Sequence, residues 1–392
     1  MQWCGMPEPG SSSENTCLPI FNHDNQIAFM RKPAFHNLIT AALATLLLPL
    51  TATAQQADLQ TEPVPVSPPL FTDHTPLSVT IEAPLTTLMT IRPDEEYLDG
   101  TFSYTTVDGT AQTFDLKIRT RGNFRRKEEH CDFAPIRLNF RKKQIEGTLF
   151  EGQDKLKLVT HCDNGNTYFD QLVLREYLAY RFYQAMTEQS FGVRLFQVTY
   201  VNTEDTGSLT RIGFVIEDDE DVADRIGLKR VKTGDIMHGD LDRQAENLVN
   251  VFQYMIGNTD YSLVRGEPDK NCCHNIELMS ATGEAPYIPV PFDFDFAGLV
   301  NAPYAAPNVK FHLRNVRQRL YRGQCRNNDL LPGTFKLFLD KRTAFQGILD
   351  DIEYLSGRTR KDVPAFLNVF FERISSQKKM NSAFINKCVD SE

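Results

Sequence analysis

The chain has 392 residues and a net charge of −9 at neutral pH, and 41% of its residues are hydrophobic. This length suffices for one large or two modest domains with buried cores. An acidic chain lacks the basic stripe with which a general nucleic-acid binder displaces phosphate counterions, and an anionic membrane surface repels it. We therefore expect a folded protein whose partners include neither nucleic acid nor an anionic membrane.

An export signal is predicted near the N-terminus. From Met30 the sequence reads MRKPAFHN, so two basic residues precede an apolar run over residues 38–50. The small residues Ala52-Thr53-Ala54 then stand before Gln55. This three-part pattern is typical of a secretory signal peptide, and the run is shorter than the roughly 20 residues that span a bilayer. An N-terminal membrane anchor and a buried helix are the alternatives.

The signal divides the chain into an upstream extension over residues 1–29, the signal peptide over residues 30–54, and the mature part. Cleavage near Ala54-Gln55 is expected to leave an exported bacterial protein, periplasmic or extracellular. No later run has transmembrane length, so we predict no transmembrane segment in the mature chain.

The first part of the mature chain has mostly the pattern of strands. Residues 55–75 are rich in Pro, Gln and Thr and are interpreted as a flexible lead-in. Within residues 76–216, segments such as QTFDLKIRTRG and APIRLNF alternate apolar and polar residues at period two. One helix is predicted over residues 169–186, and a hairpin follows with its turn at residues 202–208.

Helices dominate the prediction for residues 217–392. Apolar residues at helical spacing predict a helix over residues 240–256, and Gly257 stands where a helix end favours a residue that tolerates left-handed geometry. YIPVPFDFDFAG is predicted as a short strand, and most of residues 315–377 as helical. The sequence thus predicts an α+β fold of two lobes, a β-rich N-terminal lobe (76–216) and an α-rich C-terminal lobe (217–392).

The cysteine count agrees with export. Cleavage would leave six cysteines: Cys131, Cys162, Cys272, Cys273, Cys325 and Cys388. An even number in an exported chain favours disulfides, and chain order favours joining the first two and pairing the other four among themselves. A zinc site at Cys272, Cys273 and His274 is the alternative, although no CxxC spacing supports it.

The segment Asp293-Phe294-Asp295-Phe296 is the strongest candidate for a site. On a strand, residues two apart point the same way, so Asp293 and Asp295 would share one face and the phenylalanines the other. Neighbouring carboxylates repel unless a cation or proton separates them, and Mg²⁺ or Mn²⁺ accepts such oxygen ligands. We therefore predict metal ligands here, with a solvated strand edge as the alternative.

A second candidate follows the predicted helix at residues 240–256. Asp260 ends the segment Gly-Asn-Thr-Asp, and Asn275 lies just before a predicted strand at residues 276–279. Kinases use an Asp to orient the acceptor hydroxyl, an Asn for one metal and a later Asp for the metals that bridge the phosphates. We predict Asp260 as catalytic and Asn275 as a metal ligand. An Asx turn at Asp260 and a turn or cap role for Asn275 are the alternatives.

Several residues of the first half are assigned to binding of a nucleotide. Arg119, Arg121 and Asn123 end a predicted strand and could hold phosphates through their side chains, although an ordinary basic turn explains them equally. Lys155 and Lys157 share a strand face, which could also be solvated. Glu217 is placed in the same set, while the acidic run 217–221 as a whole favours a solvated turn or helix start.

These segments resemble the spore-coat protein H (CotH) family of secreted atypical kinases. The resemblance is carried by RTRGN, KLKLV, the helix at 169–183, GNTD and PVPFDFDFAG, in the family's order, over residues 117–298. It implies a kinase-like fold that binds ATP and Mg²⁺, with Asp260 in the catalytic loop and Asp293 or Asp295 on the metal. Phe124 departs from the family's RGNSS pattern.

Three functions follow from these features. The first is Mg²⁺-dependent transfer of phosphate from ATP to a protein or envelope acceptor. The second is a non-catalytic envelope or surface protein with the same fold. The third is a metal-dependent hydrolase, in which His161 or His274 would activate water.

Overall fold

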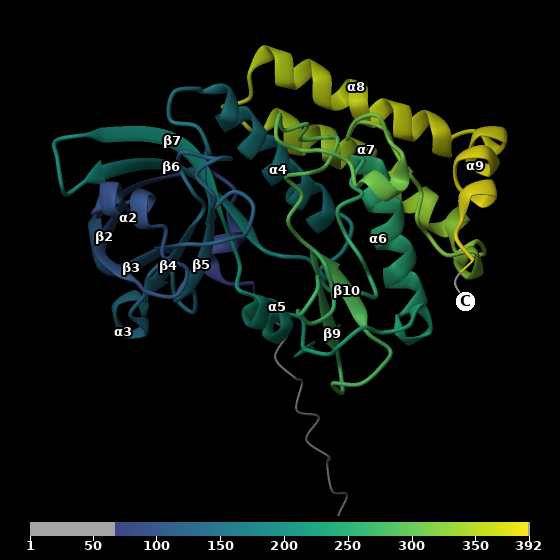
Figure 1. Cartoon of the computed structure of the whole chain (residues 1–392), viewed down its shortest axis with the longest axis horizontal. Coiled ribbons are helices and arrows are strands. Elements are labelled where there is room, and N and C mark those ends of the chain that lie inside the picture. Colours follow the sequence, from purple (N-terminus) through teal and green to yellow (C-terminus); the bar gives the residue numbers. More distant parts are fainter. Residues whose placement is uncertain (1–66, 391–392) are drawn as a thin grey trace, which may run out of the picture. The chain divides into compact units, whose positions relative to one another are not determined.

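Seven strands in the first half of the chain close into a β-barrel (Figure 1). The computed structural model describes residues 67–390, so the predicted signal peptide and the extension before it lie outside the described residues. The strands are β1 (Leu77–Ala83), β2 (Leu98–Thr105), β3 (Ala111–Thr120), β4 (Ile136–Phe140), β5 (Lys155–Val159), β6 (Val193–Asn202) and β7 (Ser208–Ile216). They are joined in the order β1-β2-β3-β4-β5-β7-β6.

The closure of the barrel depends on one long-range pairing. β1 runs parallel to β6 with Leu77 opposite Phe196, whereas the other neighbours pair antiparallel. The alternating side chains of the strands point into a shared aromatic interior, where Phe102 meets Phe140 and Phe150 at ring-centroid distances of 5.2 and 5.1 Å. Such inward-facing residues fill a small barrel and leave no open edges between β1 and β6.

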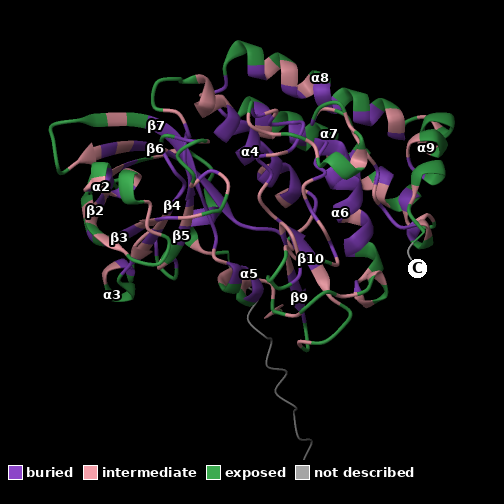
Figure 2. Cartoon of the chain, in the orientation of Figure 1, coloured by how far each residue is buried: buried purple, intermediate pink, exposed green. Residues whose placement is uncertain are grey.

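Four helices accompany the barrel strands in sequence: α1 (Pro69–Thr72), α2 (Leu85–Ile91), α3 (Lys142–Ile145) and α4 (Tyr168–Gln184). Although residues 55–75 were predicted as a flexible lead-in, α1 buries Leu70 and Phe71 in the barrel core. The helix predicted over residues 169–186 is α4, which packs on β6 and β7 and also contacts α7. Figure 2 shows that α4 is buried along most of its length.

The remaining elements of the described chain are α5 (Asp219–Arg225), β8 (Lys229–Val231), η1 (His238–Asp240), α6 (Arg243–Ile256), β9 (Ile276–Ser280), β10 (Ile288–Pro291), η2 (Val309–Phe311), η3 (Cys325–Asn327), α7 (Leu331–Asp350), α8 (Gly357–Ile374), α9 (Gln377–Ala383) and η4 (Ile385–Lys387). Strands β8, β9 and β10 form a small antiparallel sheet. Helix α6 packs against β10, α7 and α8 (Figure 1). Its apolar residues join those of α4 in one core, and the barrel interior forms a second.

The two-lobed, kinase-like fold predicted from the sequence is therefore wrong. The strands of the first half close on themselves as a seven-stranded barrel, and the second half adds a three-stranded sheet as well as helices, which makes the fold mixed α/β. Alternation along a strand predicts which face is buried, but it carries no information about whether the two outermost strands meet. The described residues fall within one compact unit.

Several local predictions are confirmed. The helix predicted over residues 240–256 is α6, and Gly257 ends it in the left-handed conformation with φ of 68°. The predicted hairpin is the pair β6–β7. Four glycines between the barrel strands have positive φ: Gly109, Gly122, Gly147 and Gly152.

Three cysteine pairs within residues 67–390 lie at disulfide distance: Cys131–Cys162, Cys272–Cys273 and Cys325–Cys388. The expected grouping of the six cysteines is confirmed, since the first two pair with each other and the other four pair among themselves. None of the helices in the described part of the chain combines the length and the apolar character that crossing a membrane requires.

Candidate functional site

Asp260 and Asn275, the predicted catalytic residue and metal ligand, are joined by hydrogen bonds. The left-handed Gly257 turns the chain after α6, and the Asn258 side chain then accepts a hydrogen bond of 2.9 Å from the Asp260 amide. Asn275 Nδ2 donates to the Asp260 carbonyl oxygen at 2.7 Å and to its Oδ2 at 3.1 Å. The predicted Asx turn is present as well, and it places the Asp260 carboxylate beside the amide of Asn275.

His274 also contacts Asp260, and it bridges two carboxylates. Its Nε2 lies 3.0 Å from Asp260 Oδ1 and its Nδ1 lies 3.3 Å from Glu267 Oε1. The hydrogen bond with Asp260 raises the pKa of His274. Because both ring nitrogens face carboxylates, neither is free to take a proton from water. His161, the other candidate, is fully buried against Phe133. Neither histidine is therefore placed to activate water, as the hydrolase hypothesis requires.

Asp293 and Asp295 do not lie on a strand, so the predicted shared strand face is wrong. β10 ends at Pro291, and Asp293 has a left-handed backbone with φ of 59°. The Asp293 amide donates to the Tyr180 hydroxyl of α4 at 2.8 Å, which accounts for the sharp turn. Asp disfavours strands and tolerates left-handed geometry, which explains why the strand stops before it.

Because this segment is a turn, the side chains of Phe292, Phe294 and Phe296 contact different parts of the protein. Phe294 packs on Tyr180 and Phe252 within the core. Phe292 lies 5.4 Å from the ammonium of Lys157, and Phe296 packs on Phe124 and Tyr304. The aromatic residues fix the turn from several sides, which holds the two carboxylates in a defined position.

The Asp295 carboxylate is buried beside other charged groups. The residue is 6% exposed, and Tyr304 donates its hydroxyl to Oδ2 at 3.2 Å. Burial, followed by the negative charge of Asp293, raises the pKa of Asp295 to about 7, although Arg125 opposes the shift. Asp260 also raises this pKa, so the two predicted acidic segments act on each other electrostatically. We call Asp260, Asn275, Asp293 and Asp295 the acidic centre.

Two charged residues beside the acidic centre, Glu176 and Arg125, were not singled out from the sequence. Glu176 on α4 is 2% exposed, and burial together with Asp295 and Asp293 raises its pKa well above the usual value. Arg125 is 9% exposed, and its guanidinium lies 3.9 Å from the Glu176 carboxylate and donates to the Thr160 carbonyl. The signal that could have revealed Glu176 is its helical spacing from apolar residues, since Leu172 and Tyr180 lie four positions away on either side.

Arg121 reaches the acidic centre, whereas Arg119 does not. Burial lowers the pKa of Arg121, and the charges of Asp293, Tyr180 and Glu176 oppose that shift. Arg119 instead donates to the Asp94 carbonyl and lies 5.1 Å from the Tyr97 ring. The two side chains have different partners because β3 ends at Thr120, between the two arginines. Asn123, two residues further on, is exposed.

The other predicted nucleotide contacts are engaged elsewhere or exposed. Lys157 pairs with Asp219, and Lys155 is exposed on β5. Glu217 is fully buried and accepts hydrogen bonds from the Gly192 amide at 2.8 Å and from Arg225 at 2.9 Å.

The acidic run that begins at Glu217 starts helix α5, as predicted, with Asp218 as its N-cap. It is not solvated throughout, because the ion pairs bury Glu217 and Asp219.

The residues of the acidic centre fit a hard divalent cation only in part. No group of three or more His, Cys, Asp or Glu side chains within residues 67–390 has the arrangement of a complete metal site. Mg²⁺, however, is usually held by one or two carboxylates together with phosphate oxygens and water. Asp293 and Asp295 are carboxylates of this kind, and the pKa of Asp295 is raised first by its burial and then by the negative charge of Asp293, which a cation would offset.

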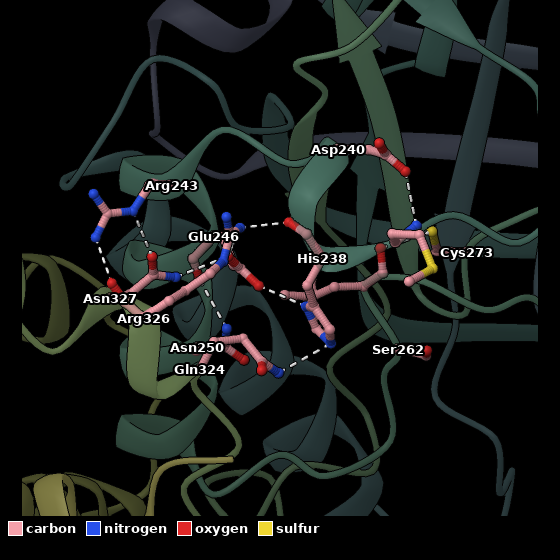
Figure 3. A network of polar contacts seen from close by, with 12 residues as sticks. His238, Asp240, Arg243, Glu246, Asn250, Ser262, Cys273, Gln324, Arg326 and Asn327 are labelled. Atoms are coloured by element: carbon pink, nitrogen blue, oxygen red, sulfur yellow. Dashed lines mark hydrogen bonds and ion pairs between the residues drawn. The ribbon is translucent and has the colours of Figure 1, made fainter. Parts of the chain in front are cut away.

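A separate polar network in the second half is satisfied internally (Figure 3). His238 Nδ1 lies 2.6 Å from Glu246 Oε1, while Arg326 and Asn327 donate to Oε2 at 2.6 and 2.7 Å. Gln324 Nε2 donates to His238 Nε2 at 3.0 Å. Both oxygens of the buried Glu246 and both nitrogens of His238 have partners, so this network joins η1, α6 and η3 and leaves neither of these two residues free for chemistry.

Comparison of the chain with protein-family models gave no match, and comparison with curated proteins gave none either.

Proposed function

We propose that this protein is a phosphotransferase that moves a phosphoryl group from a nucleotide such as ATP to a protein or envelope acceptor, with Mg²⁺ or Mn²⁺ at the acidic centre. The observation that carries the proposal is that Asn275, which is hydrogen-bonded to Asp260, also accepts a hydrogen bond of 3.1 Å from the amide of Phe292, next to Asp293, while the charge of Asp260 acts on Asp295. The resemblance of GNTD and DFDFAG to the CotH family supports the same reaction class. Export, inferred from residues 30–54, is part of the proposal.

The surroundings of the acidic centre suit the requirements of phosphoryl transfer. Such reactions depend on positioning and on stabilisation of charge more than on covalent chemistry. Asp260 would orient the acceptor hydroxyl, because its carboxylate is held by Asn275 and His274. Arg121 and Arg125 bring positive charge toward the same carboxylates and would contact phosphate oxygens. A divalent cation on Asp293 and Asp295 would neutralise the phosphates.

The test uses the purified, oxidised protein with labelled ATP and Mg²⁺ or Mn²⁺. We expect label to be transferred to the protein itself or to an envelope extract, and transfer to fall by at least about 100-fold in Asp260→Asn and Asp293→Asn, as is typical for loss of a catalytic group. Asp99→Asn is the matched control, because that carboxylate is 85% exposed on the barrel surface. Equal transfer by all four proteins would refute the assignment. Absence of nucleotide binding would favour the non-catalytic alternative.

A further inference from the structure

The loop between β3 and β4 carries three side chains into the acidic centre. This loop, residues 121–131, is here called the strap. The charge of Asp293 acts on the guanidinium of Arg121, and the guanidinium of Arg125 lies 3.9 Å from the Glu176 carboxylate. Phe124 packs edge-on against Phe296 and tilted against Tyr304, at centroid distances of 5.2 and 5.6 Å. The strap therefore forms one side of the acidic centre.

The end of the strap is tied covalently to the segment that receives Arg125. Cys131 is paired with Cys162, and the Thr160 carbonyl, two residues earlier, accepts the hydrogen bond from Arg125. The Cys162 carbonyl accepts a further hydrogen bond of 3.1 Å from the Phe133 amide. One short segment, residues 160–162, thus fixes both the end of the strap and the cation within it.

The strap has no regular secondary structure, and Phe124 is its main apolar contact with the rest of the protein. Its other attachments are polar: Arg126 pairs with Asp94 at 2.7 Å, Arg92 donates to the Arg126 carbonyl at 2.7 Å, and the Arg121 amide donates to the Pro135 carbonyl at 2.9 Å. Segments with few buried apolar contacts open at low free energy. The disulfide adds a covalent restraint to these polar contacts.

We propose that the Cys131–Cys162 disulfide is a redox lock that assembles the acidic centre. When the bond is formed, the strap lies against the acidic centre, where Arg121, Phe124 and Arg125 are in place. When the bond is reduced, the strap moves away from the acidic centre and the carboxylates lose these partners. Formation occurs by exchange with an external disulfide: the two thiols lose two protons and two electrons, and the external disulfide is reduced to two thiols.

The consequence for activity rests on the proposed function. The chain would be inactive while its thiols are reduced inside the cell and would acquire a complete centre after export to an oxidising compartment. The seating of the strap, in contrast, is a property of the fold and can be measured without any activity.

The experiment compares Cys131→Ser/Cys162→Ser with Cys325→Ser/Cys388→Ser, which removes a disulfide that ties η3 to the C-terminal residues. Hydrogen exchange measured by mass spectrometry reports the strap, and Mn²⁺-dependent label transfer reports the centre. We expect exchange in residues 121–131 to rise by about tenfold or more in the first variant only, with α6 still protected. Label transfer should fall at least about tenfold in that variant and stay at the wild-type level in the control.

Reduction of the folded wild-type protein by dithiothreitol provides the second route, because it needs no refolding of a variant. It must loosen the strap to the same degree, with alkylation of Cys131 confirming that the bond is open. Unchanged exchange in the strap, or the same increase in both cysteine variants, would overturn the lock. If the wild type transfers label and the first variant transfers it equally, the lock fails and the proposed function stands. If the strap loosens but the wild type transfers nothing, the lock stands and the proposed function fails.

Discussion

The buried imidazole of His161 is expected to make this protein sensitive to mild acid. The side chain has no exposed surface, its ring stacks on Phe133 at a centroid distance of 4.5 Å, and its Nε2 lies 2.7 Å from Asn164 Oδ1. Burial lowers the pKa of His161 to about 3, and the charges of Arg211 and Arg125 act in the same direction while Asn164 opposes them. The folded protein therefore holds this histidine neutral well below the pH at which an unfolded chain protonates it.

The change in the free energy of unfolding with pH follows from the difference between the pKa of His161 in the folded and in the unfolded chain. An unfolded histidine titrates near pH 6.5, so the stabilising contribution is complete above that value and is lost as the pH falls toward the folded pKa of about 3. Each pH unit in this window costs about 1.4 kcal/mol of the free energy of unfolding. Because the unfolded histidine is already half protonated at pH 6.5, the loss from this single group between pH 6.5 and 4.5 is about 2 kcal/mol.

Urea unfolding of the wild type and of His161→Gln, followed from pH 7.5 to 4.5 at constant ionic strength, isolates this contribution. Glutamine does not titrate, and all other groups are shared by the two proteins. The difference in the free energy of unfolding, wild type minus variant, should fall by about 2 kcal/mol over the last two pH units. A difference that stays constant with pH would refute the reasoning, whatever its absolute value.

Three further changes test the packing and charge of the fold by urea unfolding. Arg125→Met should lower the free energy of unfolding by about 3–5 kcal/mol because it leaves Glu176 without its cation, and the loss should be smaller in a Glu176→Gln background. Equal losses in both backgrounds would contradict the pairing. Phe150→Ala should lower the free energy of unfolding by about 3–5 kcal/mol, since the fully buried ring fills the barrel. A loss below about 1 kcal/mol would count against a packed interior. Gly257→Ala should lower the free energy of unfolding by about 1–2 kcal/mol, because φ is 68° there and a Cβ would lie 3.1 Å from Phe366 Cζ. An unchanged urea midpoint would exclude that strain.

Signals that depend on neighbouring residues were read correctly from the sequence. The amphipathic spacing of residues 240–256 and the following Gly257 predicted α6 and its end, because helix periodicity and left-handed termination are properties of a single local segment. The pairing of Cys131 with Cys162 was also predicted from chain order.

The contacts between segments that are distant in sequence were decided by the tertiary structure alone. The parallel pairing of β1 with β6 closes the barrel, and no property of either strand alone reveals its partner. Glu176 becomes part of the acidic centre because α4 packs beside the turn that holds Asp295. Glu217, predicted to bind a ligand, is instead paired with Arg225. A charged side chain takes its role from whichever partner the fold brings within reach, and that partner lies outside its own stretch of sequence.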